Sequence, residues 1–162
     1  MSDLYSVANQ TVKLLKENNL SVSFAESCTG GTLSQLITSV SGASQVFELG
    51  VCCYSNDIKH KVLNVPKDIL ETYGAVSQET AIILAKEIRR LANSSFGVSV
   101  TGVAGPTKSE GKEVGTVYIG FCDGSNAFAV NLNAEKTLSR TEIRELSAKT
   151  ALNLVIEHCL TK

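Results

Sequence analysis

At residues 24–32 the chain reads Phe24-Ala25-Glu26-Ser27-Cys28-Thr29-Gly30-Gly31-Thr32, where an apolar run ends at polar residues and paired glycines precede the next helix. Residues 21–25 suit a short buried strand, whereas residues 32–37 carry apolar side chains at helical spacing. The join between them therefore lies at the carboxyl end of a strand, which is where open α/β sheets bind their ligands.

Two hydroxyl side chains at this join, Ser27 and Thr29, are candidates for chemistry. The first N–H groups of the following helix are unpaired donors with a partial positive charge, so they could serve as an oxyanion hole for a nucleophile beside them. Gly30 and Gly31 would let a ligand approach the backbone closely. An ordinary strand-to-helix turn with Thr29 as its N-cap explains the same residues equally well.

Composition limits the class of protein. A chain of 162 residues with 43% hydrophobic and 19% charged residues predicts one domain, residues 1–162, with a sizeable core. The net charge of -1 gives no basic field, so we expect no nucleic-acid partner. The N-terminus lacks a basic, apolar leader and no apolar run reaches about 18 residues, which predicts a soluble, cytoplasmic protein that does not contact membranes.

Five cysteines form no C-x-x-C pair, and an odd number suits reduced thiols in the cytosol. With two histidines, a structural zinc site is not expected, and we predict neither a metal nor a cofactor. Cys28 could be a reactive thiol beside a helix N-terminus, although a small buried filler is the favoured role.

The order of the predicted elements indicates a three-layer α/β/α sandwich with a mixed β-sheet. A hairpin signal at residues 123–125 makes the last two strands antiparallel neighbours. The predicted helices span residues 4–18, 32–39, 57–63, 68–73, 77–92 and 139–160, and the predicted strands span residues 21–25, 46–54, 96–100, 114–122 and 126–132.

The common catalytic motifs G-x-G-x-x-G, G-x-x-x-x-G-K-[ST], H-E-x-x-H and G-x-S-x-G do not occur around these elements. A Ser-His-Asp triad is disfavoured because His158 lies near the chain end and His60 suits a solvated helix position. If Ser27 is a nucleophile, Lys59 is the natural base, as in Ser-Lys variants of the triad. Its pKa would have to fall by about 3 units, roughly 4 kcal/mol, most of it from burial. A solvated surface lysine is the alternative.

Two further segments carry candidate binding groups. Arg140 and Arg144 lie four residues apart on the last predicted helix, so they could bind a phosphate or carboxylate together, or pair with neighbouring glutamates. Thr101-Gly102, at the end of another strand, could line a pocket with a hydroxyl and backbone amides, or belong to an ordinary loop.

Five ordered motifs make the chain resemble the CinA C-terminal domain family over residues 4–160. They are Ala25-Glu26-Ser27-Cys28-Thr29-Gly30-Gly31, Tyr54-Ser55-Asn56-Asp57-Ile58-Lys59, Gly74-Ala75-Val76-Ser77, Thr101-Gly102-Val103-Ala104-Gly105-Pro106 and Val114-Gly115-Thr116-Val117. Many stand-alone members are nicotinamide-nucleotide amidohydrolases, which convert nicotinamide mononucleotide to nicotinic acid mononucleotide and ammonia in pyridine-nucleotide salvage.

The resemblance implies a hydrolase with an α/β/α sandwich, a homodimer and no metal requirement. It further implies Ser27 as nucleophile, Lys59 as general base and Tyr54 as a partner in proton transfer. The implied substrate-binding residues are Thr29, Gly30, Gly31, Thr101, Gly102 and Arg140.

Two segments depart from the family pattern at places where substrate would bind. Residues 107–113 are more charged and poorer in glycine than the usual loop, and Leu138-Ser139 stands where the family favours Gly-Asp before Arg140. These departures favour an alternative function, a non-catalytic nucleotide-binding or protein-interaction module of the same fold.

Overall fold

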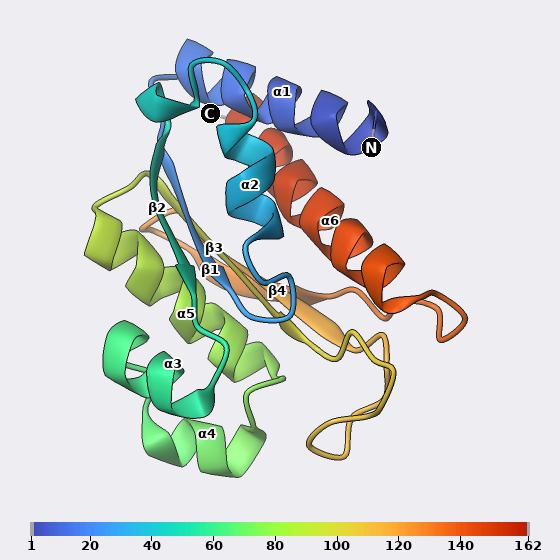
Figure 1. The fold of residues 1–162 in the computed structure, drawn as a ribbon. Coiled ribbons are helices and arrows are strands. Elements are labelled where there is room, and N and C mark those ends of the chain that lie inside the picture. Colours follow the sequence, from blue (N-terminus) through green and yellow to red (C-terminus); the bar gives the residue numbers. More distant parts are fainter. Residues whose placement is uncertain (1, 162) are drawn as a thin grey trace.

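The computed structural model describes residues 2–161, in which helices and strands follow the predicted order (Figure 1). Its elements are α1 (Ser2–Glu17), β1 (Val22–Glu26), α2 (Thr32–Thr38), the 3-10 helix η1 (Ala43–Gln45), β2 (Phe47–Cys52), α3 (Asn56–Leu63), α4 (Lys67–Tyr73), α5 (Gln78–Ala92), β3 (Phe96–Gly102), β4 (Val117–Cys122), β5 (Ala127–Asn131) and α6 (Arg140–Leu160).

The strands form one mixed sheet in the order β2-β1-β3-β4-β5. β1 pairs in parallel with both β2 and β3, whereas β3 with β4 and β4 with β5 are antiparallel. Because β1, β2 and β3 run in the same direction, the chain leaves all three at one edge of the sheet. This edge brings together the segments that follow Glu26, Cys52 and Gly102.

Helices cover both faces of the sheet, with α1, α2 and α6 on one side and α3, α4 and α5 on the other (Figure 1). In strand β3, large and small residues alternate between the two faces of the sheet. Its large side chains Phe96, Val98 and Val100 enter the larger hydrophobic core, while Gly97 and Ser99 lie beneath α5. The predicted three-layer sandwich with a mixed sheet is therefore confirmed.

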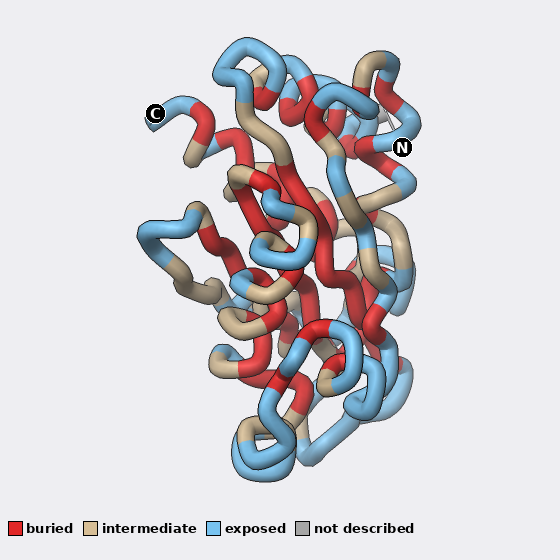
Figure 2. The backbone as a smooth tube through the Cα atoms, turned by 90° about the vertical axis from the view of Figure 1, so that its left-hand side faces the viewer, coloured by how far each residue is buried: buried red, intermediate tan, exposed pale blue. Residues whose placement is uncertain are grey.

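Two glycines set the distance between α5 and the sheet. A Cβ on Gly97 would lie 2.1 Å from the carbonyl oxygen of Ala85, and one on Gly120 would lie 2.2 Å from that of Ala81. Real Cβ atoms do not approach a carbonyl oxygen so closely, so the helix packs directly on the strand backbone at these positions. Buried residues run along the strands through the interior, and exposed residues lie in the peripheral turns and on the outer faces of the helices (Figure 2).

Two predicted strands differ from the observed ones. β2 is an edge strand of six residues that alternate between half-buried and exposed, so the prediction of a long, mostly buried strand over residues 46–54 is wrong. β4 begins at Val117 rather than at residue 114, because Gly115 and Thr116 bond instead within the loop, to Val103 and Glu113. Within residues 2–161, no helix has both the length and the apolar character needed to cross a bilayer.

Candidate active site

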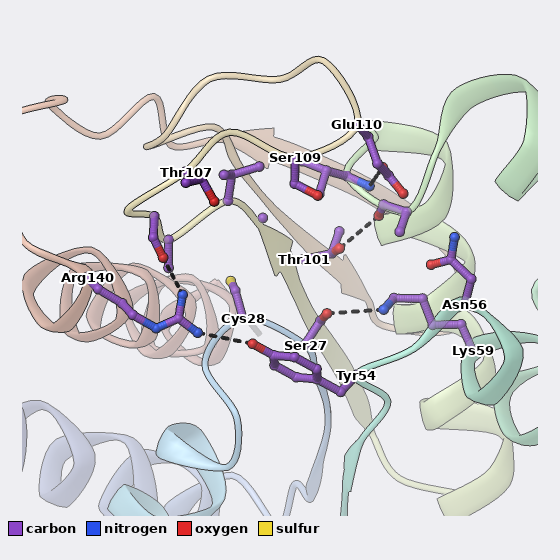
Figure 3. Close-up of a pocket in the computed structure, with 16 residues that line it drawn as sticks. Ser27, Cys28, Tyr54, Asn56, Lys59, Thr101, Thr107, Ser109, Glu110 and Arg140 are labelled. Atoms are coloured by element: carbon purple, nitrogen blue, oxygen red, sulfur yellow. Dashed lines mark hydrogen bonds between the residues drawn. The ribbon is translucent and has the colours of Figure 1, made fainter.

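A cavity of about 280 Å³ lies at the edge of the sheet where β1, β2 and β3 end (Figure 3). Three separate strand ends and the start of α6 contribute to its walls, which are therefore assembled from segments far apart in the sequence. The lining residues are Ser27, Cys28, Tyr54, Asn56, Lys59, Ala75, Val76, Thr101, Gly102, Val103, Ala104, Gly105, Thr107, Ser109, Glu110 and Arg140.

Ser27 is the first residue after β1, and its backbone N–H donates to the carbonyl of Val100 at 2.9 Å, which anchors it to the neighbouring strand β3. Its side chain faces the cavity, and the residue is 9% exposed. The Nζ atom of Lys59 lies 3.1 Å from Ser27 Oγ, although the two residues are 32 positions apart. The predicted serine and lysine are thus within hydrogen-bonding distance.

Helix α3 places Lys59 in the interior. The helix begins after Ser55, whose hydroxyl accepts the N–H of Ile58 at 3.2 Å, so Ser55 is the N-cap and the helix starts one residue earlier than the predicted residue 57. Lys59 is 1% exposed, whereas Lys61 points outward and pairs with Asp57 at 2.7 Å. The two lysines face opposite environments, as expected for residues two apart on a helix.

The surroundings of Lys59 favour a neutral amine. Burial lowers its pKa from the ordinary 10.5, and the ionised forms of Cys53, Glu110 and Cys28 partly oppose this. Its Nζ also donates to the carbonyl of Cys53 at 2.7 Å. Among residues 2–161 no carboxylate forms an ion pair with this amine that would hold it in the charged state.

The amino end of α2 is not available as an oxyanion hole, which corrects the sequence prediction. The buried carboxylate of Glu26 accepts the N–H groups of Gly31, Leu33 and Ser34 at 3.0, 3.0 and 2.9 Å, and the Ser34 hydroxyl at 2.7 Å. Gly31, not Thr29, occupies the N-cap position. A carboxylate at a helix N-terminus is favoured by the helix dipole, so Glu26 caps α2 and anchors the turn that carries Ser27.

Three predicted substrate-binding residues lie outside the cavity lining, namely Thr29, Gly30 and Gly31. Thr29 is fully buried, and its hydroxyl is a side-chain oxygen without a hydrogen-bond partner among residues 2–161. A Cβ on Gly30 would approach Arg144, and one on Gly31 would approach Cys52. In the structure these three residues shape the turn behind Ser27.

The two arginines of α6 do not converge on one point. Arg140 lines the cavity and donates through Nη1 to the Gly105 carbonyl at 2.5 Å and through Nη2 to Tyr54 Oη at 3.0 Å. Arg144 instead donates to the carbonyl of Thr29 at 2.8 Å, so it supports the turn after Ser27. Of the two sequence alternatives, binding of one anion by both arginines is not favoured by this arrangement, and neither arginine forms an ion pair with a neighbouring glutamate within residues 2–161.

The altered turn before Arg140 forms a regular helix start. Ser139 caps α6 by accepting the N–H of Glu142 at 3.3 Å, and the Glu142 carboxylate accepts the Ser139 N–H at 2.8 Å. This capping box explains why the pKa of Glu142 is lowered, first by the Ser139 hydrogen bonds. Glu142 thus serves the cap and does not pair with Arg140.

Tyr54 and Thr101 both line the cavity but differ in exposure, since Tyr54 is exposed and Thr101 is buried. Tyr54 is 63% exposed at the mouth, and its hydroxyl contacts Arg140 rather than Ser27 or Lys59. Thr101 is buried at the end of β3, where its hydroxyl donates to the carbonyl of Ala75 at 2.7 Å. Next to it, a Cβ on Gly102 would lie 2.7 Å from the Val117 side chain, so only glycine fits.

Sequence reasoning missed Asn56 and Glu110 as lining residues and assigned no role to the carboxylate of Glu26. Asn56 follows the N-cap of α3 and lines the cavity, although no feature of the sequence singles it out from its neighbours. Glu110 belongs to the charged segment 107–113, in which the sequence pattern predicts no particular turn. Within residues 2–161 no three His, Cys, Asp or Glu side chains are grouped so that they could hold a metal ion.

Cys28 lines the cavity as a protonated thiol. Burial raises its pKa to about 11, with smaller opposing effects from its own backbone N–H, from the positive charge of Arg140 and from Lys59 when that amine is protonated. Near neutral pH the thiolate is therefore scarce, which disfavours a thiol nucleophile at this position.

Fold and cavity together define an α/β/α protein with a buried serine–lysine pair at the carboxyl edge of a mixed sheet. Residues 4–159 match the family described as CinA C-terminal domain, and the chain belongs to this family.

Relatives with high sequence identity carry the name competence-damage inducible protein. One from Thermoanaerobacter pseudethanolicus is 47% identical over 150 residues, which cover 92% of this chain and 36% of that protein. One from Bacillus cereus (strain AH187) is 46% identical over 143 residues, which cover 86% of this chain and 34% of that protein. The chain therefore spans about a third of the length of these curated relatives.

Solved structures share the fold. The crystal structure of a competence/damage inducible protein from Agrobacterium tumefaciens is 35% identical, with a TM-score of 0.91 over 96% of this chain and 94% of that one. A CinA superfamily protein from Klebsiella pneumoniae has a TM-score of 0.94 at 22% identity, over 98% of this chain and 99% of that one, and this likeness concerns the fold alone.

Proposed function

We propose that this chain is a metal-independent amidohydrolase that converts nicotinamide mononucleotide to nicotinic acid mononucleotide and ammonia through a Ser27 acyl-enzyme. The observation that carries the proposal is the 3.1 Å separation between Ser27 Oγ and a buried Lys59 Nζ without an ion-pair partner among the described residues. The substrate class comes from the family resemblance, and the site supplies a hydroxyl, a base and backbone donors, which amide hydrolysis requires.

Acylation begins with a neutral Lys59. The amine donates one N–H to the Cys53 carbonyl and accepts the Ser27 proton on its lone pair, while Ser27 Oγ attacks the carboxamide carbon. Lys59 then returns this proton to the leaving nitrogen, so ammonia departs and an ester to Ser27 remains. In deacylation Lys59 removes a proton from water, which attacks the ester, and Ser27 regains its proton as the acid is released.

The oxyanion formed in both steps needs donors other than the α2 terminus. The loop after β3 supplies candidates, because Ala104 and Gly105 line the cavity and their backbone N–H groups have no acceptor within residues 2–161. Two such donors aimed at the developing negative charge would stabilise the tetrahedral intermediate. We assign this role to the Ala104–Gly105 backbone.

Arg140 is the group that would bind the phosphate of the nucleotide. Its guanidinium carries five N–H donors, and the structure uses Nη1 for Gly105 and Nη2 for Tyr54, so further donors remain for an anion. Tyr54, hydrogen-bonded to the same guanidinium at the cavity mouth, would move with Arg140 when the substrate enters. Thr101 acts by holding the Ala75 segment of the wall in place.

The test is the release of ammonia from nicotinamide mononucleotide, measured for the wild type and for Ser27→Ala. Replacing a nucleophile that acts together with its base lowers the rate by several orders of magnitude, so we expect turnover only in the wild type. The variant should fold normally because the Ser27 anchor to Val100 is a backbone bond. Equal rates for the two proteins would reject the proposal.

A non-catalytic nucleotide-binding or protein-interaction module is the second candidate, and the charged segment 107–113 favours it. Lys112 attaches this segment to the rest of the protein by donating to the carbonyl of Tyr73 at 2.8 Å and to that of Val76. The segment, which contributes Thr107, Ser109 and Glu110 to the cavity lining, is therefore held in place. A thermal-shift screen with nucleotides separates the two functions. A nucleotide that raises Tm without being consumed would favour the binding module.

A further inference from the structure

The cavity carries charges of opposite sign at its two ends. Among the described residues, the charged side chains that line it are Lys59, Glu110 and Arg140. Glu110 is the one acidic residue of the three. Figure 3 shows Arg140 at one end and Glu110 at the other, with Ser27 between them and Lys59 below Glu110. Because Lys59 is neutral in the active form, the cavity has a cationic end at Arg140 and an anionic end at Glu110.

A tight turn fixes the position of Glu110. Ser109 and Lys112 exchange two backbone hydrogen bonds, at 3.2 and 2.8 Å, and the two residues between them have positive φ values of 51° for Glu110 and 71° for Gly111. This is the pattern of a two-residue hairpin turn with left-handed central residues, in which a glycine is strongly preferred. Glu110 therefore projects from a defined backbone position.

The tip of this turn is attached to the segment that carries the lining residues Ala75 and Val76. The Oε2 atom of Glu110 accepts the Val76 N–H at 3.1 Å, while Lys112 donates to the carbonyls of Tyr73 and Val76. Lys112 does not line the cavity and forms no ion pair with Glu110 within the part of the chain that the structure describes. The second carboxylate oxygen of Glu110 has no hydrogen-bond partner among residues 2–161, so it is available to a ligand.

The negative charge of Glu110 interacts electrostatically with Lys59, next to Ser27. After burial, which lowers the pKa of Lys59, and the opposing effect of Cys53, the negative charge of Glu110 is the next influence and raises that pKa. A positive charge on a ligand beside Ser27 would experience the same attraction. A carboxylate formed at that position would experience repulsion, which favours release of an acidic product.

We propose that Glu110 makes this cavity selective for ligands with a positive charge next to the group held at Ser27, such as a pyridinium ring whose carboxamide faces the serine. The identity of the reacting amide rests on the proposed function, whereas the charge preference rests on the position of Glu110. Arg140 would bind the phosphate of the same ligand, which matches a molecule that is cationic at one end and anionic at the other.

The experiment compares two ligands of the same shape. Nicotinamide mononucleotide carries a pyridinium cation, and benzamide ribotide replaces the ring nitrogen with carbon and is neutral in the ring. Binding of both to Ser27→Ala is measured by titration calorimetry, so that no turnover is needed. The same measurement is made with Glu110→Gln and Glu113→Gln, each introduced into Ser27→Ala.

Glu113→Gln is the matched control, because Glu113 lies in the same segment, pairs with Lys136 at 3.2 Å and does not line the cavity. Glutamine at position 110 can still accept the Val76 N–H, and a thermal melt checks that the fold is kept. We expect Glu110→Gln to reduce the preference for the cationic ligand by about three- to tenfold, the range for a partly exposed charge pair, and 0.5 M salt to reduce it by about as much. Glu113→Gln should leave the preference unchanged.

Several results would overturn the proposal. They are an unchanged preference in Glu110→Gln, an equal loss in Glu113→Gln, and failure of both ligands to bind. The wild type is assayed separately for ammonia release. Binding with a Glu110-dependent charge preference but no ammonia would reject the amidohydrolase function and leave the charge selectivity standing.

Discussion

Lys59 Nζ lies closer to the carbonyl oxygen of Cys53, at 2.7 Å, than to Ser27 Oγ, at 3.1 Å. This backbone carbonyl, one residue after β2, therefore orients the amine independently of the serine. A neutral amine held in this way has its lone pair free for the Ser27 proton. The pair is thus preorganised by the edge of the sheet, and its chemistry depends on how readily Lys59 loses its charge.

The first prediction concerns the dependence of activity on pH. Because the proposed base acts in its neutral form, kcat/KM should rise with pH through the pKa of Lys59 in the free enzyme, and burial places this limb below the ordinary value of 10.5. Lys59→Ala should lose the limb and lower kcat by about 10²- to 10⁴-fold with a smaller change in KM.

Glu110→Gln offers an independent check on this assignment. The charge of Glu110 raises the pKa of Lys59, so its removal should move the ascending limb to lower pH. Glu113→Gln, which removes a charge outside the cavity, should leave the limb in place. A limb that stays unchanged in Lys59→Ala would mean that another group is the base.

The second prediction concerns stability. Lys59 has a lower pKa in the folded chain than in the unfolded chain, so between these two pKa values the unfolded state binds more protons. The free energy of unfolding therefore increases with pH across this window, which ends near 10.5, and this contribution is absent in Lys59→Met. The free energy of unfolding of the wild type minus that of Lys59→Met should rise with pH when both are measured by urea denaturation.

Lys61→Met is the control for this measurement, because Lys61 lies on the same helix but is exposed and paired with Asp57. Its stability curve should stay parallel to that of the wild type as the pH increases. Parallel curves for Lys59→Met as well would show that Lys59 titrates normally and that burial does not favour the neutral base.

The serine–lysine pair was accessible from sequence because it depends on local patterns. The apolar run before Ser27 predicts a strand end, and helical spacing after residue 55 makes Lys59 and Lys61 face different ways. Parallel strand order then brings two such strand ends to one edge. Strand ends, helical spacing and strand order thus predict where the backbone carries Ser27 and Lys59, and none of the three requires knowledge of contacts between distant residues.

Glu26 and Glu110 could not be placed by the same rules. Capping rules examine the residue directly before a helix, whereas Glu26 accepts N–H groups five to eight residues further along, after a turn. Glu110 reaches Val76, which is 34 residues earlier in the chain. Both positions depend on tertiary packing, which the pattern of single residues does not encode.

The third prediction concerns substrate binding. Arg140→Ala should raise KM for nicotinamide mononucleotide by roughly ten- to hundredfold, the range for loss of a charge-assisted bond to a phosphate, and should change kcat less. Arg90→Ala is the control, because Arg90 is exposed and pairs with Glu87 at 2.8 Å, away from the cavity. A fall in kcat with an unchanged KM would assign Arg140 to the chemical step instead.

The fourth prediction concerns the carboxylate that caps α2. In Glu26→Gln the side-chain oxygen can still accept from Ser34, but the amide N–H₂ then meets the N–H groups of Gly31 and Leu33, which lose their acceptor. Leaving buried donors unpaired costs about 1–3 kcal/mol, so the free energy of unfolding should fall by that amount. The measurement is urea denaturation, with Glu48→Gln as an exposed control in β2.

Glu26→Gln should also affect the rate of the proposed reaction, because Glu26 and Ser27 are adjacent and the cap fixes the turn between β1 and α2. A turn that shifts moves Ser27 Oγ relative to Lys59 Nζ, and small displacements of reacting groups reduce the rate strongly. Glu26→Gln should therefore lower kcat with little change in KM, since the binding groups at Arg140 and Glu110 belong to other segments. A variant that loses stability but keeps its full kcat would limit Glu26 to a structural role.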